Sequence, residues 1–480
     1  MTVRVDFNEA RLSSVLDGLI PLVDTPAVVS RSLDLVLYAV AVPLDPPEDD
    51  PDAEPAFRQL IMANDKRGSL YDKVGGFACS DDGKLWVGIA SEDVHWLIVN
   101  HEKKGQLGAG RPFVSPDGSG YACTQTVKDG PEGYPKTRVL IGDQAGPAFQ
   151  TVEAAGFGAR GAFAYVAYDE GQFGVIVGGE PMGPYGDVAE LCWSPDGGRL
   201  AFICGEPAKF ERSVVIDAKR GPSFLDVRGL RFSPDSARLA YVAAEKEGER
   251  VVVDGTPGPL FTRCLPVEFS GDSRAVIGRV AVERGWAVAL NNRAGAVYDE
   301  VGPPVASRDA ATVAYGARRG ETSVVVVNGV ESEPCDHVYR VAVGEKAGVA
   351  YALLQGKTCV LIHNGRAVYR GGPRPNHLAI SPDGAAIAYS ESQDGKVRIH
   401  CDGASGDWFT SIDRLGFAPD GRTPVYIGQD GEQTFVVLGG KRYGPMAPLS
   451  DFVFNEAGDK LAVLAQIGRE YWRKILPLTK

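Results

Sequence analysis

Serine and aspartate recur together in this chain, a pair of residue types that could supply a nucleophile and a carboxylate. Intact Ser-Pro-Asp-Gly tetrapeptides begin at Ser115, Ser194 and Ser381. Altered copies begin at Ser80, Ser233, Ser270, Ser307, Ala418 and Asn455, with weaker matches at Ser30, near Ala159 and at Glu345. A nucleophile does not need to be repeated in every unit, and no Gly-x-Ser-x-Gly elbow occurs. We therefore interpret the tetrapeptide as a tight turn, in which Pro presets φ while Asp and Ser bond nearby backbone groups.

The other residue types that carry chemistry show no catalytic or metal-binding spacing. The sequence contains six histidines, without an HExxH or zinc-type pattern, and we expect structural or surface roles for His95, His101, His337, His363, His377 and His400. The eight cysteines lack a CxxC pair, and several replace Ala or Val of other units, so we expect buried free thiols. Calcium-loop and phosphate-loop spacings are also missing. The sequence thus predicts no catalytic residue, metal site or cofactor.

The tetrapeptide recurs at intervals of 35 to 44 residues from Ser80 onward, which marks a repeat architecture. A second series of turn residues keeps the same period: Asn64, Asn100, Gly142, Gly178, Asp217, Asp254, Asn291, Asn328, Asn364, Asp402 and Gly439. Between the two series lie short predicted strands such as 238–243 and the β-branched run 250–253, and 254–255 has the Asp-Gly sequence of a two-residue hairpin. Four short antiparallel strands per unit predict an all-β, β-propeller fold rather than a β-solenoid.

These strand–SPDG–strand units resemble the blades of bacterial WD40-like propellers of the TolB type. The resemblance covers about Leu22 to Leu478 and is specific for the blade, not for an activity. It implies a propeller that binds partner proteins, in a family that is often periplasmic. The Trp-Asp dipeptides of true WD40 repeats do not occur, so their hydrogen-bond network is not implied. Propellers of the prolyl-oligopeptidase kind have similar blades, but they precede a hydrolase domain for which no residues remain here.

Twelve units can be drawn, the first of them degenerate, which exceeds the usual four to eight blades of one ring. We expect two fused propellers, at residues 1–262 and 263–480, with six plus six units the simplest split. Seven plus five units and a single ring of twelve are the alternatives. A further alternative is that the two ends of the chain together complete one blade, which places the second propeller within the first. One short helix is expected at Asn8–Asp17, with Asn8 as its cap and Gly18 at its end.

The composition limits the partners and the compartment. The net charge is −12 over 480 residues and the basic residues are scattered, which argues against a nucleic-acid partner. The N-terminus lacks a basic segment followed by an apolar one, so we expect no signal peptide and a cytoplasmic protein. The apolar run Leu33–Val42 is too short to span a bilayer, and no membrane insertion is expected.

An acidic, proline-rich insertion at 43–55 exceeds the repeat and is the one candidate docking segment. Its carboxylates are Asp45, Glu48, Asp49, Asp50, Asp52 and Glu54, without a basic residue among them. We expect an exposed loop that either engages a basic surface on a partner or serves only as a solubilising insertion. The sequence favours a non-enzymatic interaction scaffold or an accessory subunit of a larger complex. The alternative is a hydrolase or lyase with its site in a propeller's central channel.

Overall fold

The chain is an all-β protein. A computed structural model describes residues 8–14, 20–21, 28–32, 34–44, 56–107, 110–128, 135–206, 211–448, 453–454, 458, 460–467 and 470–477. These residues form eleven antiparallel sheets; ten have four or five strands, and the eleventh has eight. No helix occurs in the described part of the chain. Repeated four-stranded antiparallel sheets are the blades of a β-propeller, so the predicted fold class is confirmed.

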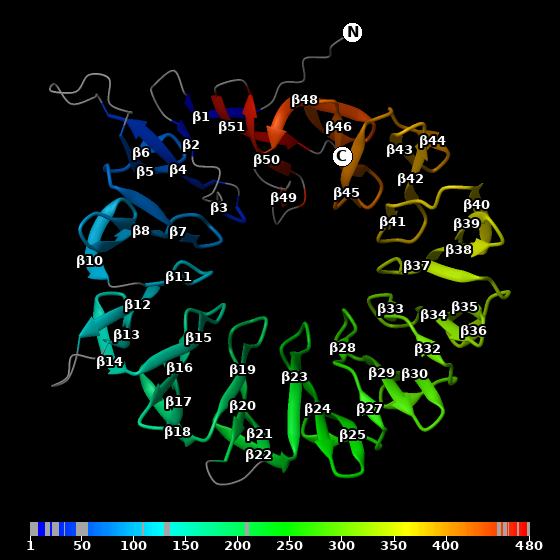
Figure 1. The fold of residues 1–480 in the computed structure, drawn as a ribbon, viewed down its shortest axis with the longest axis horizontal. Helices are drawn as coiled ribbons and strands as arrows, with labels where there is room; N and C mark the ends of the chain where they lie inside the picture. Colours follow the sequence, from blue (N-terminus) through cyan, green and yellow to red (C-terminus); the bar gives the residue numbers. More distant parts are fainter. Residues whose placement is uncertain are drawn as a thin grey trace. The chain divides into compact units, whose positions relative to one another are not determined.

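The strands are numbered in chain order, and most of them are labelled in Figure 1. The strands up to residue 193 are β1 (Asn8–Ser14), β2 (Ile20–Pro21), β3 (Val28–Val29), β4 (Val36–Pro43), β5 (Phe57–Ala63), β6 (Lys66–Arg67), β7 (Lys73–Cys79), β8 (Trp86–Ser91), β9 (His95–Val99), β10 (Glu102–Leu107), β11 (Pro112–Val114), β12 (Tyr121–Lys128), β13 (Pro135–Ile141), β14 (Gln144–Phe149), β15 (Thr151–Phe157), β16 (Phe163–Asp169), β17 (Gln172–Val177), β18 (Glu180–Tyr185) and β19 (Val188–Trp193).

The remaining strands are β20 (Leu200–Gly205), β21 (Arg212–Ile216), β22 (Lys219–Phe224), β23 (Asp226–Phe232), β24 (Leu239–Glu245), β25 (Gly248–Val253), β26 (Thr256–Pro257), β27 (Arg263–Cys264), β28 (Glu268–Phe269), β29 (Val276–Val282), β30 (Gly285–Leu290), β31 (Arg293–Ala294), β32 (Glu300–Val301), β33 (Val305–Ala306), β34 (Val313–Arg319), β35 (Thr322–Val327), β36 (Val330–Glu331), β37 (His337–Val343), β38 (Val349–Gln355), β39 (Thr358–His363), β40 (Arg366–Gly371), β41 (Leu378–Ile380), β42 (Ile387–Gln393), β43 (Lys396–Cys401), β44 (Ala404–Ser405), β45 (Ser411–Phe417), β46 (Pro424–Asp430), β47 (Gln433–Leu438), β48 (Lys441–Pro448), β49 (Val453–Phe454), β50 (Lys460–Ile467) and β51 (Glu470–Pro477).

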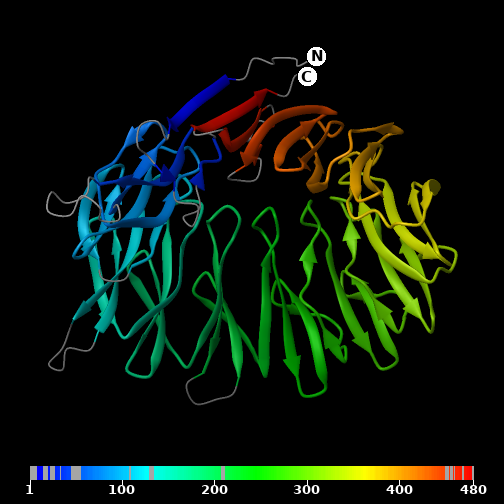
Figure 2. The same ribbon diagram turned by 45° about the horizontal axis from the view of Figure 1, so that its top comes forward.

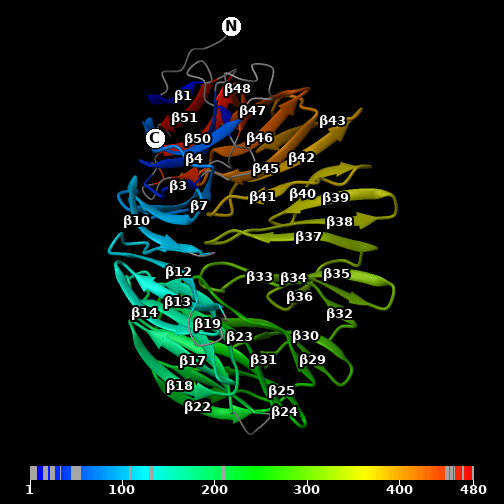
Figure 3. The same cartoon turned by 60° about the vertical axis from the view of Figure 1, so that its left-hand side comes forward.

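The chain divides into two compact units. Unit 1 comprises residues 1–198 and 446–480, and unit 2 comprises residues 199–445. Within unit 2 the sheets from β23 to β44 follow one another side by side in chain order (Figures 1 and 3). The number of rings and the boundary between 262 and 263 stay predictions.

One blade of unit 2 shows how the sequence specifies the sheet. Strand β24 pairs with β23 on one side and with β25 on the other. Five successive residues of β24, Leu239 to Ala243, are buried. A strand covered on both faces carries a continuous apolar run rather than an alternating one, and the second strands β16 and β20 show the same buried run as β24.

The repeated Ser and Asp hold the turn between the first and second strands. In the β23–β24 turn, Ser233 Oγ donates to Asp235 Oδ1 at 2.5 Å and accepts the Arg238 N–H at 2.9 Å. The same carboxylate oxygen accepts the Ala237 N–H at 3.0 Å. Equivalent Ser–Asp bonds occur at Ser80–Asp82, Ser115–Asp117, Ser194–Asp196, Ser270–Asp272, Ser307–Asp309 and Ser381–Asp383. The interpretation of the tetrapeptide as a turn is confirmed.

The second series of turn residues joins the third strand to the fourth. In the β25–β26 turn, φ is 52° at Asp254 and 75° at Gly255. Asp254 Oδ1 also accepts the Leu239 N–H at 3.0 Å, which ties the turn to the start of β24. In seven other blades the side-chain oxygen of the turn residue likewise accepts the backbone N–H at the start of the second strand. These turn residues are Asn64, Asn100, Asp217, Asn291, Asn328, Asn364 and Asp402. These residues therefore form the turns that their spacing predicts.

Gly255→Val is expected to destabilise unit 2 by about 1–3 kcal/mol, because a β-branched residue is strained at positive φ. No neighbour lies within 4 Å of the position a Cβ would take, so backbone strain alone accounts for the loss. Gly255→Asn is the control, since Asn292 adopts φ of 65° in the equivalent turn of the next blade. Thermal denaturation should show a lower midpoint for the Val variant and little change for Asn. Equal midpoints for wild type and Val would contradict the turn geometry.

The hydrophobic core lies between successive blades. One cluster of unit 2 joins Ile277 and Val288 of one sheet to Val301, Tyr315 and Val326 of the next. A buried bridging residue follows each two-residue fourth strand of unit 2 and forms an isolated bridge to the start of the third strand. These pairs are Phe261 with Glu249, Tyr298 with Trp286, Cys335 with Ser323 and Phe409 with Val397. Each blade therefore depends on its neighbours for burial, as in other repeat proteins.

The predicted helix at Asn8–Asp17 is wrong, because residues 8–14 form strand β1. This strand pairs antiparallel with β51, with Asn8 opposite Ile475 and Ser14 opposite Glu470. Figure 2 shows the two strands side by side, β1 in blue and β51 in red. The outer edge of β51 offers unpaired backbone groups that an added strand satisfies, and this long-range pairing overrides the local capping signal. Both strands belong to unit 1.

Candidate functional site

The acidic docking loop lies outside the described residues. Asp45, Glu48, Asp49, Asp50, Asp52 and Glu54 all fall in the segment 45–55, between β4 and β5. Its proposed role in docking stays a prediction. The structure instead brings together a set of residues in unit 2 that sequence reasoning did not single out.

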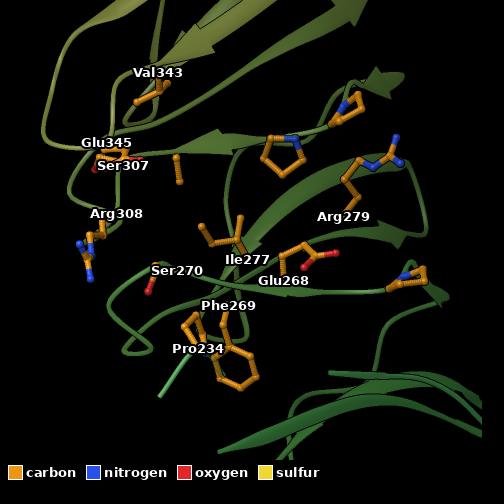
Figure 4. Close-up of a pocket in the computed structure, with 16 residues that line it drawn as sticks. Pro234, Glu268, Phe269, Ser270, Ile277, Arg279, Ser307, Arg308, Val343 and Glu345 are labelled. Atoms are coloured by element: carbon orange, nitrogen blue, oxygen red, sulfur yellow. The ribbon is translucent and has the colours of Figure 1, made fainter. Parts of the chain in front are cut away.

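A cavity of about 650 Å³ opens beside the first strands of two consecutive blades of unit 2. Its wall includes Phe269 of β28, Ile277 and Arg279 of β29, and Val343 at the end of β37 (Figure 4). Four prolines also line it, Pro234, Pro266, Pro303 and Pro304, and we call this site the proline cavity. Its size falls within the range of small-molecule pockets.

Prolines create this cavity by interrupting two first strands. Elsewhere in unit 2 the first strand is one continuous element, as in β23 and β37. Here Pro266 separates β27 from β28, and Pro303-Pro304 separates β32 from β33. Proline has no N–H to donate to a ladder, so neither strand pairs along its whole length with the second strand of its blade.

Arg279 is the unusual residue of the proline cavity. The blades can be aligned on the residue of the second strand whose carbonyl accepts the N–H of the turn residue. In this blade that residue is Val276, which accepts from Asn291, and Arg279 lies three residues after it. The residues at this position in the other blades are uncharged: Ala39, Ile89, Thr124, Val166, Ile203, Val242, Gly316, Ala352, Ser390 and Ile427. The half-buried Arg279 donates to the Val301 carbonyl at 3.4 Å. Among the described residues it makes no ion pair, so its charge is available to a ligand.

Other residues of the cavity make contacts to neighbouring blades through a side chain or through the backbone. Glu268 lies 3.4 Å from Arg231 of the preceding blade. The Arg308 N–H donates to the Glu345 carbonyl at 2.6 Å, which joins two successive turns. The cavity thus offers an apolar floor with two guanidiniums, those of Arg279 and Arg308, that make no ion pair among the described residues. This arrangement suits binding of an apolar group carrying an acceptor oxygen.

The cysteines are free thiols, five of them buried and three half-buried. Burial raises the pKa of the Cys123 and Cys264 thiols to about 12. Burial, followed by nearby acidic groups, raises the pKa of Cys79 and Cys401 to about 11. Because the thiolate is the reactive form, these groups behave as small apolar side chains.

Most histidines have structural surroundings. His101 packs edge-on against Trp86, and burial lowers its pKa. His363 lies 3.0 Å from the Gly384 carbonyl of the next turn. His377 is half-buried, and burial lowers its pKa. His400 differs, because it lies between a carboxylate and a serine hydroxyl. The sequence expectation of a structural or surface role missed this contact.

The described residues show neither a metal-binding cluster nor a membrane-spanning helix. No group of three or more His, Cys, Asp or Glu side chains there is placed to hold a metal ion. Nor does this part of the chain contain a helix whose length and hydropathy would allow it to cross a membrane.

Comparison with known proteins supplies structural similarity without a family. No protein-family model matches the sequence, and no similar sequence is found among curated proteins. A crystal structure of a eukaryotic initiation factor is 13% identical, with a TM-score of 0.37, covering 71% of this chain and 96% of its own. An oligogalacturonate lyase in complex with manganese is 12% identical, with a TM-score of 0.26, covering 60% and 96% respectively. At these values neither protein's activity carries over to this chain.

Proposed function

We propose that the chain is a protein-interaction scaffold or accessory subunit, and that the proline cavity receives a segment of its partner. The cavity is the observation that carries this proposal, because its volume, apolar floor and unpaired Arg279 are features of a binding site. The neighbouring blades present a rigid frame around it. As part of this proposal we place the chain among WD40-like propellers of the TolB type, on the strength of the Ser-Pro-Asp-Gly turns.

The chemistry of the cavity indicates what the partner presents. Phe269, Ile277 and Val343 offer apolar contact, and a guanidinium binds a carboxylate with two parallel hydrogen bonds. We therefore infer that the segment is an extended peptide with an apolar side chain next to a carboxylate. A hydrolase or lyase with a site in a central channel is the alternative function. The partner is a protein rather than a nucleic acid in this proposal, in keeping with the net charge of −12.

Ala306→Trp, which fills the cavity, is expected to weaken partner binding at least tenfold, equivalent to about 1.4 kcal/mol. The partner is first identified by affinity purification of the tagged chain from its own host and mass spectrometry. It is then purified and titrated against wild type and variant by calorimetry. Arg279→Met, which keeps an apolar stem and removes the charge, should weaken binding in the same assay.

The matched control for Ala306→Trp is Ala385→Trp, at an exposed turn position of a different blade in unit 2. It adds the same side chain outside the cavity and should leave the affinity unchanged. Melting midpoints of both variants show whether the sheets remain folded. If Ala306→Trp folds and binds the partner as tightly as wild type, the cavity is not the docking site.

A further inference from the structure

A serine, a histidine and a glutamate form a hydrogen-bonded line in another blade of unit 2. Ser405 Oγ on β44 lies 3.1 Å from His400 Nδ1 on β43. His400 Nε2 lies 2.7 Å from Glu391 Oε2 on β42. The three strands are consecutive neighbours in the sheet order β41-β42-β43-β44. A nucleophile, a base and a carboxylate that orients the base are the components of a serine hydrolase triad, which is recognised by geometry rather than by sequence order.

Comparison between blades shows that the histidine and glutamate replace core residues. His400 stands two residues before the hairpin turn residue Asp402. The equivalent residues of the other blades are all apolar: Met62, Ile98, Leu140, Ile176, Val215, Val252, Ala289, Val326, Ile362 and Val437. The position of Glu391 is occupied elsewhere by the uncharged residues Val40, Ala90, Gln125, Ala167, Cys204, Ala243, Val280, Ala317, Leu353 and Gly428.

This replacement is costly for a purely structural blade. The side chain of His400 is 14% exposed and that of Glu391 is 26% exposed, so both lose most of their contact with water. A buried charged group requires partners that an apolar pair does not. The other blades fold with apolar residues at the histidine position and uncharged residues at the glutamate position, which indicates that this blade retains the pair for another reason.

We propose that Ser405, His400 and Glu391 form a hydrolytic site for carboxylic esters, an activity separate from partner binding at the proline cavity. Ser405 Oγ attacks the ester carbonyl and its proton passes to His400 Nδ1. The alcohol then leaves with that proton, and an acyl-serine remains. Water, deprotonated by the same nitrogen, hydrolyses the acyl-serine and releases the acid, so the proton returns to Ser405. Glu391 accepts the Nε2–H throughout and stabilises the imidazolium.

The edge of the sheet supplies access and a donor for the oxyanion. Ser405 is exposed, on the outermost strand β44. The Gly406 N–H donates to the Ile399 carbonyl at 2.8 Å, so Ser405 and His400 form the alternate pair, without mutual backbone bonds. In an antiparallel ladder the N–H of such a residue points away from its partner strand. The Ser405 N–H therefore faces solvent beside its own hydroxyl, where it can stabilise a tetrahedral oxyanion.

Arg398 fixes the carboxylate of this site. It lies across the strand pair from Glu391, and its Nε and Nη2 lie 2.7 and 2.6 Å from Glu391 Oε2. Its guanidinium also lies 4.4 Å from the centre of the Trp408 ring. The hydrogen bond to His400, and then those from Arg398, lower the pKa of Glu391, so the carboxylate stays ionised beside the imidazole. Tyr389 stacks on the other side of His400 with ring centres 5.2 Å apart.

Two probes test the proposal. A fluorophosphonate should label wild-type protein at Ser405, identified by mass spectrometry of the labelled peptide. Hydrolysis of p-nitrophenyl acetate should fall to background in Ser405→Ala, and by at least about 100-fold in His400→Gln, the scale of general-base catalysis. Glu391→Gln, which keeps an acceptor without the charge, should lower kcat and leave KM unchanged.

Ser223→Ala is the matched control, because Ser223 is an exposed serine of the outer strand β22 whose hydroxyl meets Ser213 at 3.0 Å. It should keep full labelling and hydrolysis. Labelling of wild-type Ser405 is read directly, so the test does not depend on any variant folding. Absence of label at Ser405, or hydrolysis that survives in folded Ser405→Ala, would show that the line of residues is structural only. Ala306→Trp should keep the esterase activity, which separates this test from that of the scaffold function.

Discussion

Acidification from about pH 5 to about pH 2 is expected to lower the thermal midpoint of this protein, because the turn aspartates must take up protons. The pKa of each such carboxyl is lowered in the folded chain: Asp82, Asp117, Asp235, Asp272, Asp309 and Asp383. For Asp235 the Ser233 hydroxyl is the main cause, followed by the Ala237 N–H. For Asp82 the Lys84 N–H is the first cause, and the pKa falls to about 2.

The direction of this pH dependence follows from the number of protons that the folded and the unfolded chain bind. An unfolded aspartate titrates near about pH 4, above the folded values, so the unfolded chain binds more protons between these limits. The contribution of each turn is complete above about pH 4 and is lost as the pH falls through the folded pKa. Because six turns repeat the same arrangement, their losses accumulate over one pH range.

The combined variant Asp235→Asn, Asp272→Asn, Asp309→Asn and Asp383→Asn is expected to flatten this dependence. Asparagine keeps an oxygen that accepts the Ser hydroxyl and the backbone N–H but does not titrate here. Thermal denaturation across the pH series gives the slope, which should be smaller than in wild type. Glu247→Gln, Glu283→Gln and Glu321→Gln, at exposed loop positions, provide the control and should leave the slope unchanged. Equal slopes for wild type and the Asn variant would contradict the role of the turns.

Phe409→Ala is expected to destabilise unit 2 by about 3–5 kcal/mol, as for other large-to-small changes of a buried aromatic residue. Phe409 is fully buried, meets Tyr426 edge-on at 6.1 Å, and has the Arg442 guanidinium 4.3 Å from its ring centre. A Cβ on Gly428 would lie 2.6 Å from Phe409 Cδ1, so the ring already fills the space over the second strand. Chemical denaturation monitored by circular dichroism measures the loss.

Leu260→Ala is the control for Phe409→Ala. Leu260 lies next to the bridging residue Phe261 of another blade but is 40% exposed, so its truncation should change stability by no more than about 0.5 kcal/mol. Phe409→Leu should fall between the two, because it keeps part of the buried volume. A Phe409→Ala variant as stable as wild type would mean that the bridging residues do not hold the sheets together.

The turns could be predicted from the sequence because their chemistry is local. Ser233 and Asp235 act within a few residues of each other, and Asp254-Gly255 carries its own positive φ. The period then extends each local prediction to the other units. Strand β1 could not be predicted in this way, since its pairing with β51 joins residues that are far apart in the chain.

The two candidate sites depend on register, which the period alone does not give. Ser405 meets His400 only through the pairing of β43 with β44, and His400 meets Glu391 only across β42 and β43. A usable signal was nevertheless present. When the described units are aligned on their turn residues, His400 is the one residue that is not apolar at its position in the second half of the third strand. Glu391 and Arg279 are the charged residues at positions of the second strand where the other units have uncharged ones. The proline cavity required the strand order as well, although Pro266 and Pro303-Pro304 mark where the strands are interrupted.

The pairing of β1 with β51 has a mechanical consequence. In this antiparallel pair Asn8 lies opposite Ile475, so the start of one strand and the end of the other lie at the same end of the ladder. A tensile load applied at these two points breaks the hydrogen bonds between the two strands one pair at a time, rather than loading all of them at once in shear. Strand β1 would therefore peel away first, at low force, and expose the edge of β51 while the blades between them still carry no load.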